Sequence, residues 1–197
     1  MTEVLMSTRE RLLRSAREVI EDSGYGAASV AAIAERAGVA AGTLYRHFPS
    51  KEELFVDVFR SVCAGEERAM QAAAAALPKG ASAVDRLEAV LSTFANRALR
   101  NPRLAWALIA EPVDQLVDAE RSTYRERYAG LVGEVLRAAI SAGEIPPQNV
   151  EFTAAAVVGG CGEALVGPLS PFAGSRPAAE DVVAALRGFV RRSVGAA

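Results

Sequence analysis

Apolar residues recur every three or four positions along most of the chain, a spacing typical of one face of an α-helix. Leu12, Ala16, Val19 and Ile20 form the first such face. Glycine and proline interrupt the pattern at intervals, and no useful length of chain alternates between apolar and polar residues as a strand would. The sequence therefore predicts an all-α protein of about nine helices, over residues 8–23, 30–37, 41–48, 51–77, 82–100, 103–110, 115–142, 148–167 and 178–194.

Serine residues stand at the expected starts of several helices. Ser7 with Glu10, and Ser50 with Glu53, have the spacing of a capping box, in which the serine hydroxyl and the glutamate each accept a backbone N–H. Ser29 is the expected N-cap of the second helix.

The composition agrees with a helical globular protein. Of the 197 residues, 51% are hydrophobic and 23% are charged, which excludes intrinsic disorder. Alanine, the best helix former, occupies 40 positions. The formal net charge of −2 argues against a protein that coats nucleic acid non-specifically, but it leaves room for a local DNA-binding surface.

Residue usage predicts a cytoplasmic protein. The two cysteines, Cys63 and Cys161, form no pair motif, as expected in a reducing compartment. The N-terminal segment contains Glu3 and lacks the apolar run of a signal peptide. The longest apolar run, over residues 152–162, is about half the length that crosses a membrane, so no membrane partner is expected.

Residues 29–51, SVAAIAERAGVAAGTLYRHFPSK, have the pattern of a helix-turn-helix unit. Ala34 is small where the two short helices must approach each other. Gly38 supplies the turn between them, where a positive φ is favourable only for glycine. Ile33, Val39 and Leu44 are expected to pack this pair onto the first helix.

The exposed face of the predicted third helix offers hydrogen-bond donors. Thr43, Tyr45 and His47 suit phosphate oxygens, while Arg46 can also donate two hydrogen bonds to a guanine edge. Residues 36–51 contain no acidic side chain, although acids make up roughly one residue in eight of the chain. This local excess of positive charge is what a DNA-binding surface requires.

The run GVAAGTLYRHFPSKEEL, within residues 8–54, resembles the N-terminal domain of TetR-type (tetracycline-repressor-like) transcriptional regulators. The resemblance covers about a quarter of the chain and includes the Tyr-x-His-Phe ending. It implies a DNA-binding domain over residues 1–50 and a ligand-binding and dimerisation domain over residues 51–197. It further implies a homodimer that binds a palindromic operator in double-stranded DNA and is released by a small-molecule effector.

The resemblance also implies roles for individual residues. Thr43, Tyr45, His47 and Lys51 become the expected phosphate contacts, and Ser29 is included in the DNA-binding set. The expected base-facing residues are Ala40, Ala41, Gly42 and Arg46. Many relatives have a polar pair where this chain has Ala40 and Ala41, so direct base contact depends on few side chains.

The sequence offers no catalytic or metal-binding set. His47 is the only histidine, so neither a Ser/His/Asp nor a Cys/His arrangement can form around a second one. No cluster has the spacing of metal ligands. We therefore expect no enzymatic activity, no metal and no cofactor.

Aromatic and apolar residues of the predicted fourth to seventh helices suggest a small-molecule site. The candidate lining residues are Phe59, Cys63, Phe94, Trp106, Leu108, Ile109, Tyr124 and Tyr128. Plain core packing is the alternative for each of them. Asn96, Glu111 and Glu163 are candidate polar contacts, and residues 120–127 are interpreted as a solvated face with Tyr124 turned inward.

The last two predicted helices are apolar enough to form a dimer interface. The candidate interface residues are Val158, Cys161, Leu165, Leu186, Phe189 and Val190. The alternative is that both helices are buried within one subunit. Two further functions also stay open: a DNA-binding activator or architectural protein without ligand sensing, and an all-α enzyme with a helix-turn-helix-like segment.

Overall fold

The computed structural model describes residues 6–196, so Glu3 lies outside the described residues. Within this range the chain forms nine helices and no strand, and the predicted all-α fold is confirmed. Each helix begins and ends within two residues of its predicted bounds. The helices are α1 (Thr8–Ser23), α2 (Val30–Arg36), α3 (Ala41–His47), α4 (Lys51–Ala75), α5 (Ala83–Arg100), α6 (Pro102–Ile109), α7 (Gln115–Ser141), α8 (Val150–Leu169) and α9 (Ala179–Val194).

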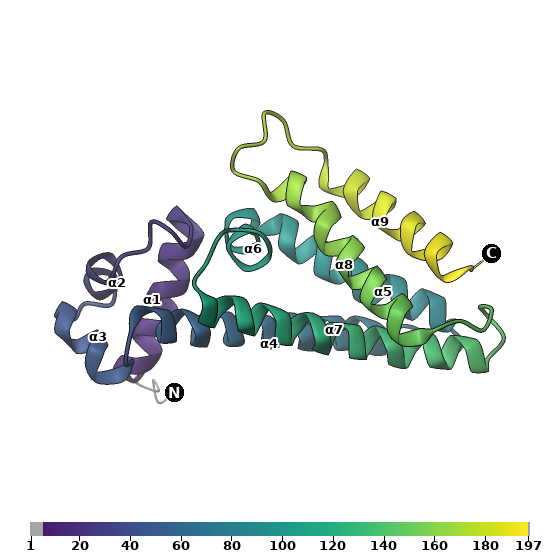
Figure 1. Cartoon of the computed structure of the whole chain (residues 1–197), viewed down its shortest axis with the longest axis horizontal. Coiled ribbons are helices and arrows are strands. Elements are labelled where there is room, and N and C mark those ends of the chain that lie inside the picture. Colours follow the sequence, from purple (N-terminus) through teal and green to yellow (C-terminus); the bar gives the residue numbers. More distant parts are fainter. Residues whose placement is uncertain (1–5, 197) are drawn as a thin grey trace.

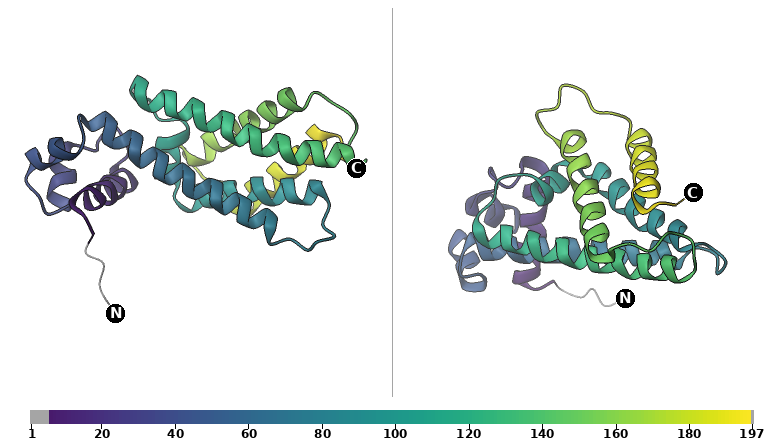
Figure 2. Two further views of the ribbon diagram at one scale, coloured as in Figure 1. Left: turned by 90° about the horizontal axis from the view of Figure 1, so that it is seen from below. Right: turned by 45° about the vertical axis from the view of Figure 1, so that its right-hand side comes forward.

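The helices form an elongated molecule with a small N-terminal unit at one end. Helices α1, α2 and α3 make up this unit, and α4 leads out of it (Figure 1). Helices α4 and α7 then run side by side along the length of the molecule, as the left view of Figure 2 and the contacts between the two helices show. Helix α8 packs across α7 and α5, and α9 packs against α5 and α8, in the upper right of Figure 1.

Two hydrophobic clusters make up the core. The first contains most buried residues of α1–α3, residues of α4 from Leu54 to Cys63, Leu104 and Ala107 of α6, and Val117 and Tyr124 of α7. The second contains Met70 of α4 and the buried faces of α5, α7, α8 and α9. Helix α4 therefore contributes to both clusters, and the first cluster extends well past residue 50.

The helix caps largely follow the predicted pattern. Ser7 and Glu10 form the complete capping box, with the Ser7 hydroxyl accepting from Glu10 N and the Glu10 carboxylate accepting from Ser7 N. The Ser50 hydroxyl accepts from Glu53 N at 3.2 Å, but within residues 6–196 no return bond to the Glu53 side chain forms. The second complete box is at Ser82 and Asp85, where it was not predicted.

Helix α8 ends later than the sequence predicted. It continues through Gly167 and Pro168 to Leu169, because a proline in the last turn removes only one backbone hydrogen bond. With 20 residues it is long and apolar enough to cross a membrane by length and composition alone, in contrast to the prediction from its shorter apolar run. In the structure it packs against α5, α6, α7 and α9.

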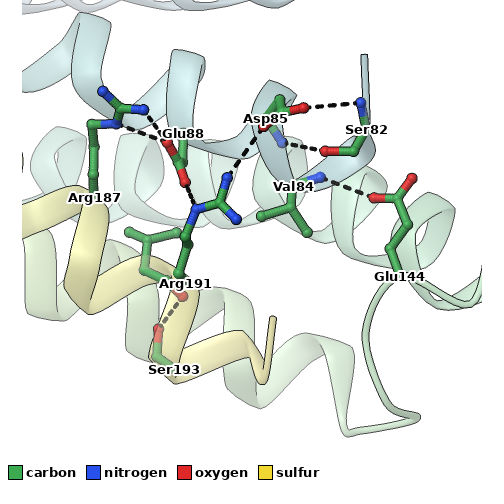
Figure 3. A network of polar contacts seen from close by, with 9 residues as sticks. Ser82, Val84, Asp85, Glu88, Glu144, Arg187, Arg191 and Ser193 are labelled. Atoms are coloured by element: carbon green, nitrogen blue, oxygen red, sulfur yellow. Dashed lines mark hydrogen bonds and ion pairs between the residues drawn. The ribbon is translucent and has the colours of Figure 1, made fainter. Parts of the chain in front are cut away.

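A buried carboxylate joins α9 to α5. Glu88 is 4% exposed and accepts from the guanidinium groups of Arg187, at 2.7 Å, and Arg191 (Figure 3). Arg191 also contacts Asp85 at 3.2 Å. Two cations offset the cost of burying the Glu88 charge, so this network fixes the position of α9 on the bundle.

Four of the six predicted dimer-interface residues lie in the core of the protomer. Cys161, Leu165, Leu186 and Val190 are buried in the second cluster, so their prediction as interface side chains is wrong. Val158 is half-buried, and Phe189 alone among the six is exposed. The error arose because α8 is apolar on several faces, and its sequence pattern does not say which face turns inward.

The complete burial of Leu165 leads to a stability prediction. We expect Leu165→Ala to lower the free energy of unfolding by about 3 kcal/mol, because it removes a side chain with no exposed surface from a packed core. Urea denaturation followed by circular dichroism measures the loss. Leu116→Ala, at a half-exposed leucine, is the matched control and should change stability by less than about 0.5 kcal/mol. Equal losses in both variants would contradict the core position of Leu165.

Candidate DNA-binding surface and ligand cavity

Helices α2 and α3 have the geometry of a helix-turn-helix. Gly38 adopts a φ of 65° in the turn, a conformation that side chains disfavour. Its N–H donates to Glu35 O and the next N–H donates to Ala34 O, both at 3.0 Å. Ala34 and Leu44 are buried, so the predicted close packing of the two helices is present.

The outward face of α3 holds most of the predicted DNA-binding residues. The exposed members are Ser29, Ala40, Ala41, Gly42, Tyr45, Arg46 and His47, and Thr43 is half-buried. Ser29 also caps α2 by accepting from Ala32 N at 3.1 Å. Tyr45 is 58% exposed, so it projects from the domain instead of packing within it.

Two cations beside α3 have specific partners. The Lys51 ammonium lies 5.6 Å from the ring centre of Tyr25 and 5.2 Å from that of Phe55. These two contacts hold the ammonium group close to the end of α3. Arg36 forms an ion pair with Asp22 at 2.5 Å. Asp22 of α1 therefore lies next to Arg36, the first of the residues 36–51 that contain no acidic side chain.

A cavity of about 530 Å³ lies among α4–α8 and brings together most of the predicted ligand-binding residues. Phe59, Cys63, Phe94, Ile109, Tyr124 and Tyr128 all line it. Leu108 and Glu163 also line it, whereas Asn96 and Glu111 do not. Val158 and Cys161, which the sequence assigned to the dimer interface, line it as well.

The aromatic side chains of the cavity form a row of mutually tilted rings between α4, α5 and α7. Ring centres are 5.8 Å apart for Phe59 and Tyr124, 6.0 Å for Tyr124 and Tyr128, and 5.9 Å for Tyr128 and Phe94. The hydroxyls of Tyr124 and Tyr128 donate to backbone carbonyls of α4 at 3.2 and 3.3 Å. Because both hydroxyls have protein partners, this wall presents mainly apolar surface to the cavity.

Among the eight aromatic and apolar candidates, Trp106 alone does not line the cavity. Its ring packs edge-on against Phe172, with ring centres 6.5 Å apart. Helix α6 has only eight residues, and the six from Leu104 to Ile109 are all apolar, so they cover more than one face. The sequence pattern therefore did not show which of these residues face the cavity. Trp106 does not, whereas four of its neighbours do: Leu104, Ala105, Leu108 and Ile109.

Both thiols of the cavity are held in the neutral form. Burial raises the pKa of the Cys63 thiol to about 12 and that of Cys161 to about 11. Within residues 6–196, no group of three histidine, cysteine or acidic side chains is placed to hold a metal ion.

The cavity also has charged lining residues that the sequence analysis missed. They are Arg17, Glu66, Arg97, Arg100, Arg121 and Arg125. Residues 120–127 are thus not simply a solvated face, because two of their arginines face the cavity. Arg121 donates to the carbonyls of Leu108 and Glu111 at 2.9 and 3.0 Å, and burial lowers its pKa. The i,i+4 spacing of Arg121 and Arg125 was the available signal.

Polar contacts join the cavity's α6 side to the helix-turn-helix unit. The Glu111 carboxylate, just after α6, accepts from the backbone N–H groups of Tyr25 and Gly26, each at 3.0 Å. The Tyr25 hydroxyl donates to Asp114, and the Arg103 guanidinium donates to Asp22 O at 2.8 Å. Glu111 therefore positions the turn between α1 and α2 and not a ligand.

Comparison with known proteins agrees with this combination of site and fold. The profile of the bacterial regulatory proteins of the tetR family matches residues 12–58. The transcriptional repressor KstR of Mycobacterium tuberculosis is 31% identical over 162 residues, which span 80% of this chain and 68% of KstR. The chain belongs to the tetR family and is a DNA-binding transcriptional regulator.

Two further relatives differ in how much of the chain they match. The transcriptional activator FasR of Mycolicibacterium smegmatis is 50% identical over 52 residues, 26% of this chain and 24% of FasR. The transcriptional regulator FadR of Bacillus subtilis, solved in complex with stearoyl-CoA, superposes with a TM-score of 0.76 at 23% identity. That superposition covers 93% of this chain and 96% of FadR, and it supports the fold of the entire chain.

The exposure of Arg46 leads to a prediction about base preference. We expect Arg46→Ala to reduce discrimination between a selected DNA site and its single-base variants by about tenfold, because Arg46 is the predicted base contact with bidentate donors. Lys51→Ala should weaken all sequences alike and lower the slope of log affinity against log salt by about one. Fluorescence anisotropy titrations at several salt concentrations measure both effects. A uniform loss on all sequences from Arg46→Ala would reassign it as a phosphate contact.

The raised thiol pKa values lead to a prediction about reactivity. In a Cys161→Ser background at pH 8, Cys63 should react with an aromatic disulfide reagent at least about a hundredfold more slowly than a free thiol, since little thiolate is present. The rate should rise as the pH approaches 12, and unfolding in urea should remove the protection. Absorbance of the released thiolate measures the rate. Fast reaction of the folded protein at pH 8 would contradict the neutral state of the thiol.

Proposed function

We propose that the chain is a ligand-responsive repressor in the cytoplasm, which binds a palindromic operator as a homodimer and is released by a small, largely apolar ligand. The observation that carries the proposal is the path of α4. This helix begins at Lys51, beside the DNA-binding surface, and its side chains Phe59, Cys63 and Met70 line the cavity. The repressor KstR, which matches most of the chain, supports the direction of regulation.

The DNA contacts in this proposal follow the exposed face of the helix-turn-helix. Thr43, Tyr45, His47 and Lys51 bind phosphates, and Ser29 lies at the edge of the same surface. Ala40, Ala41, Gly42 and Arg46 face the bases. The division into a DNA-binding domain over residues 1–50 and a ligand-binding and dimerisation domain over residues 51–197 is part of the proposal.

Homodimerisation is proposed through the exposed faces of α8 and α9. Phe152 is 74% exposed, and Ala156 and Gly159 continue the same apolar strip along α8. Phe189 of α9 lies against Gly160, where an added Cβ would come within 2.9 Å of its ring, so the two helices approach closely at this point. One short helix contacts few base pairs, which makes a two-fold dimer on two half-sites necessary for useful specificity.

Release would follow from a change in the distance between the two DNA-binding units. A ligand against Phe59 shifts α4, and a ligand against α6 shifts the Glu111 carboxylate that holds Tyr25 N and Gly26 N. The ligand acts only through its different affinity for the two states, and a tenfold effect on DNA binding requires about 1.4 kcal/mol.

An activator is the second candidate, because the identity to the activator FasR, 50%, is higher than the 31% identity to the repressor KstR. That match spans about a quarter of the chain, the part that contacts DNA, and the direction of regulation does not follow from it. An architectural protein without ligand sensing has no use for a cavity of about 530 Å³, so the cavity favours the ligand-responsive candidates.

Selection of random DNA by the purified protein tests the proposed dimer and operator. We expect the enriched fragments to contain an inverted repeat, and the free protein to sediment as a dimer. Phe152→Glu should shift the protein to monomer and weaken operator binding at least about tenfold, because it places a charge in an apolar interface. Leu116→Glu, at another exposed apolar residue, should leave both properties unchanged. Enrichment of sites without two-fold symmetry would overturn the palindromic operator.

A further inference from the structure

One of the proposed phosphate contacts, Lys51, lies against a pair of aromatic rings. Its ammonium is 5.2 Å from the ring centre of Phe55 and 5.6 Å from that of Tyr25, and the two rings are 4.7 Å apart. A lysine side chain has a flexible four-carbon stem, so these contacts restrict where its charge is held. Phe55 is one turn further along α4 and moves with Lys51. Tyr25 comes from the segment between α1 and α2, so it can act on Lys51 from outside α4.

Tyr25 is itself held by the segment between α6 and α7, residues 110–114. Its backbone N–H donates to one carboxylate oxygen of Glu111, and the N–H of Gly26 donates to the other, each at 3.0 Å. The Tyr25 hydroxyl donates to Asp114. In Figure 1 the segment between α6 and α7 passes beside α1. Tyr25 is thus part of the helix-turn-helix unit by sequence, but the backbone and the tip of the side chain are both attached to this second segment.

The packing around Glu111 favours one position of the turn between α1 and α2. Gly24 is buried and has a φ of 84°, and an added Cβ would come within 3.3 Å of a Glu111 carboxylate oxygen. Only glycine combines this conformation with so close an approach. Because both carboxylate oxygens then accept from successive N–H groups, Glu111 defines the position and the orientation of the turn that carries Tyr25.

The segment between α6 and α7 is in turn attached to the helices around the cavity. Arg121 of α7 lines the cavity and donates to Glu111 O at 3.0 Å. Asp114 is the N-cap of α7 and accepts from Leu116 N at 2.8 Å and from Val117 N at 3.2 Å. A displacement of α7 relative to α1 therefore acts on Glu111 and Asp114, and through them on Tyr25.

We propose that Tyr25 is a positioning residue for Lys51, and that Glu111 and Asp114 hold its ring where the ammonium reaches a DNA phosphate. This inference rests on the proposed function, in which Lys51 binds phosphate, and it adds a route of regulation inside one protomer. A shift of the segment between α6 and α7 moves the Tyr25 ring away from Lys51. The phosphate contact then weakens, whatever the distance between the two DNA-binding units of a dimer.

A double-mutant cycle on a selected DNA site tests the proposal. The effect of Lys51→Ala is measured by fluorescence anisotropy at constant salt in the full-length wild type, in Tyr25→Leu and in Glu111→Gln. Tyr25→Leu removes the ring, and Glu111→Gln replaces one acceptor with a donor, so one of the two N–H groups loses its partner. We expect Lys51→Ala to weaken binding about tenfold in the wild type and less than about threefold in either variant, because Lys51 is already out of position there.

Two controls separate positioning from a general loss of structure. A variant that merely unfolds part of the protein weakens binding by the same factor with or without Lys51, so it produces no coupling. Glu126→Gln, at an exposed glutamate of α7, is the matched background and should keep the full effect of Lys51→Ala. His47→Ala, at another proposed phosphate contact, should weaken binding equally in every background. If its effect is also lost in Tyr25→Leu and Glu111→Gln, the entire helix-turn-helix unit shifts, and the specific role of Tyr25 is wrong.

The remaining outcomes separate this inference from the proposed function. Equal effects of Lys51→Ala in all backgrounds would overturn the positioning role and leave the phosphate contact of the proposed function intact. If Lys51→Ala has no effect even in the wild type, the phosphate contact itself is wrong, and the inference falls with it. Coupling of Lys51 to Tyr25 without coupling to Glu111 would overturn the attachment to the segment between α6 and α7.

Discussion

The continuity of α4 is the constraint on which the rest of the structure depends. Its 25 residues span about 37 Å at the usual helical rise, and its buried side chains belong to both hydrophobic clusters. Leu54 packs in the core of the helix-turn-helix unit, while Met70 packs in the core of the larger bundle. Because backbone hydrogen bonds run without a break between them, displacement of Phe59 or Cys63 moves Lys51 with it.

Beside α4, the junction combines apolar packing of Leu104 and Ala107 with polar contacts, and the two kinds of contact differ in a way that matters for regulation. Apolar burial is non-directional and tolerates small sliding motions, whereas hydrogen bonds fix an angle. Glu111 and Arg103 connect the α6 region to the end of α1 and the turn after it through such bonds, at 2.8–3.0 Å. These few bonds can be exchanged for water at small net cost. At the junction, the apolar packing of α4 therefore transmits motion. The weaker hydrogen bonds of Glu111 and Arg103 favour particular positions of α1 relative to α6.

Sequence alone predicted the helices and the DNA-binding motif well, because both depend on local patterns. Gly38 and the capping serines act on neighbours within a few residues, and their roles were confirmed. The sites in the larger domain depend on which face of a helix turns inward. Helix α8 is apolar on several faces, so Leu165 was assigned outward although it is buried, and Trp106 was assigned to the cavity although it packs on Phe172. The cationic lining was missed because charged residues at 121–127 resemble a solvated surface until α6 is placed over them.

The cavity is the strongest reason to expect a ligand. Protein interiors pack as densely as organic crystals, and empty apolar volume reduces stability because its lining atoms lose dispersion contacts. Along the aromatic wall, both tyrosine hydroxyls already donate to α4, and both thiols are neutral. Water in the apolar interior would find few partners, whereas an alkyl chain would regain the missing contacts. The fold thus leaves open, beside its longest shared helix, a space that an apolar molecule fills more favourably than solvent.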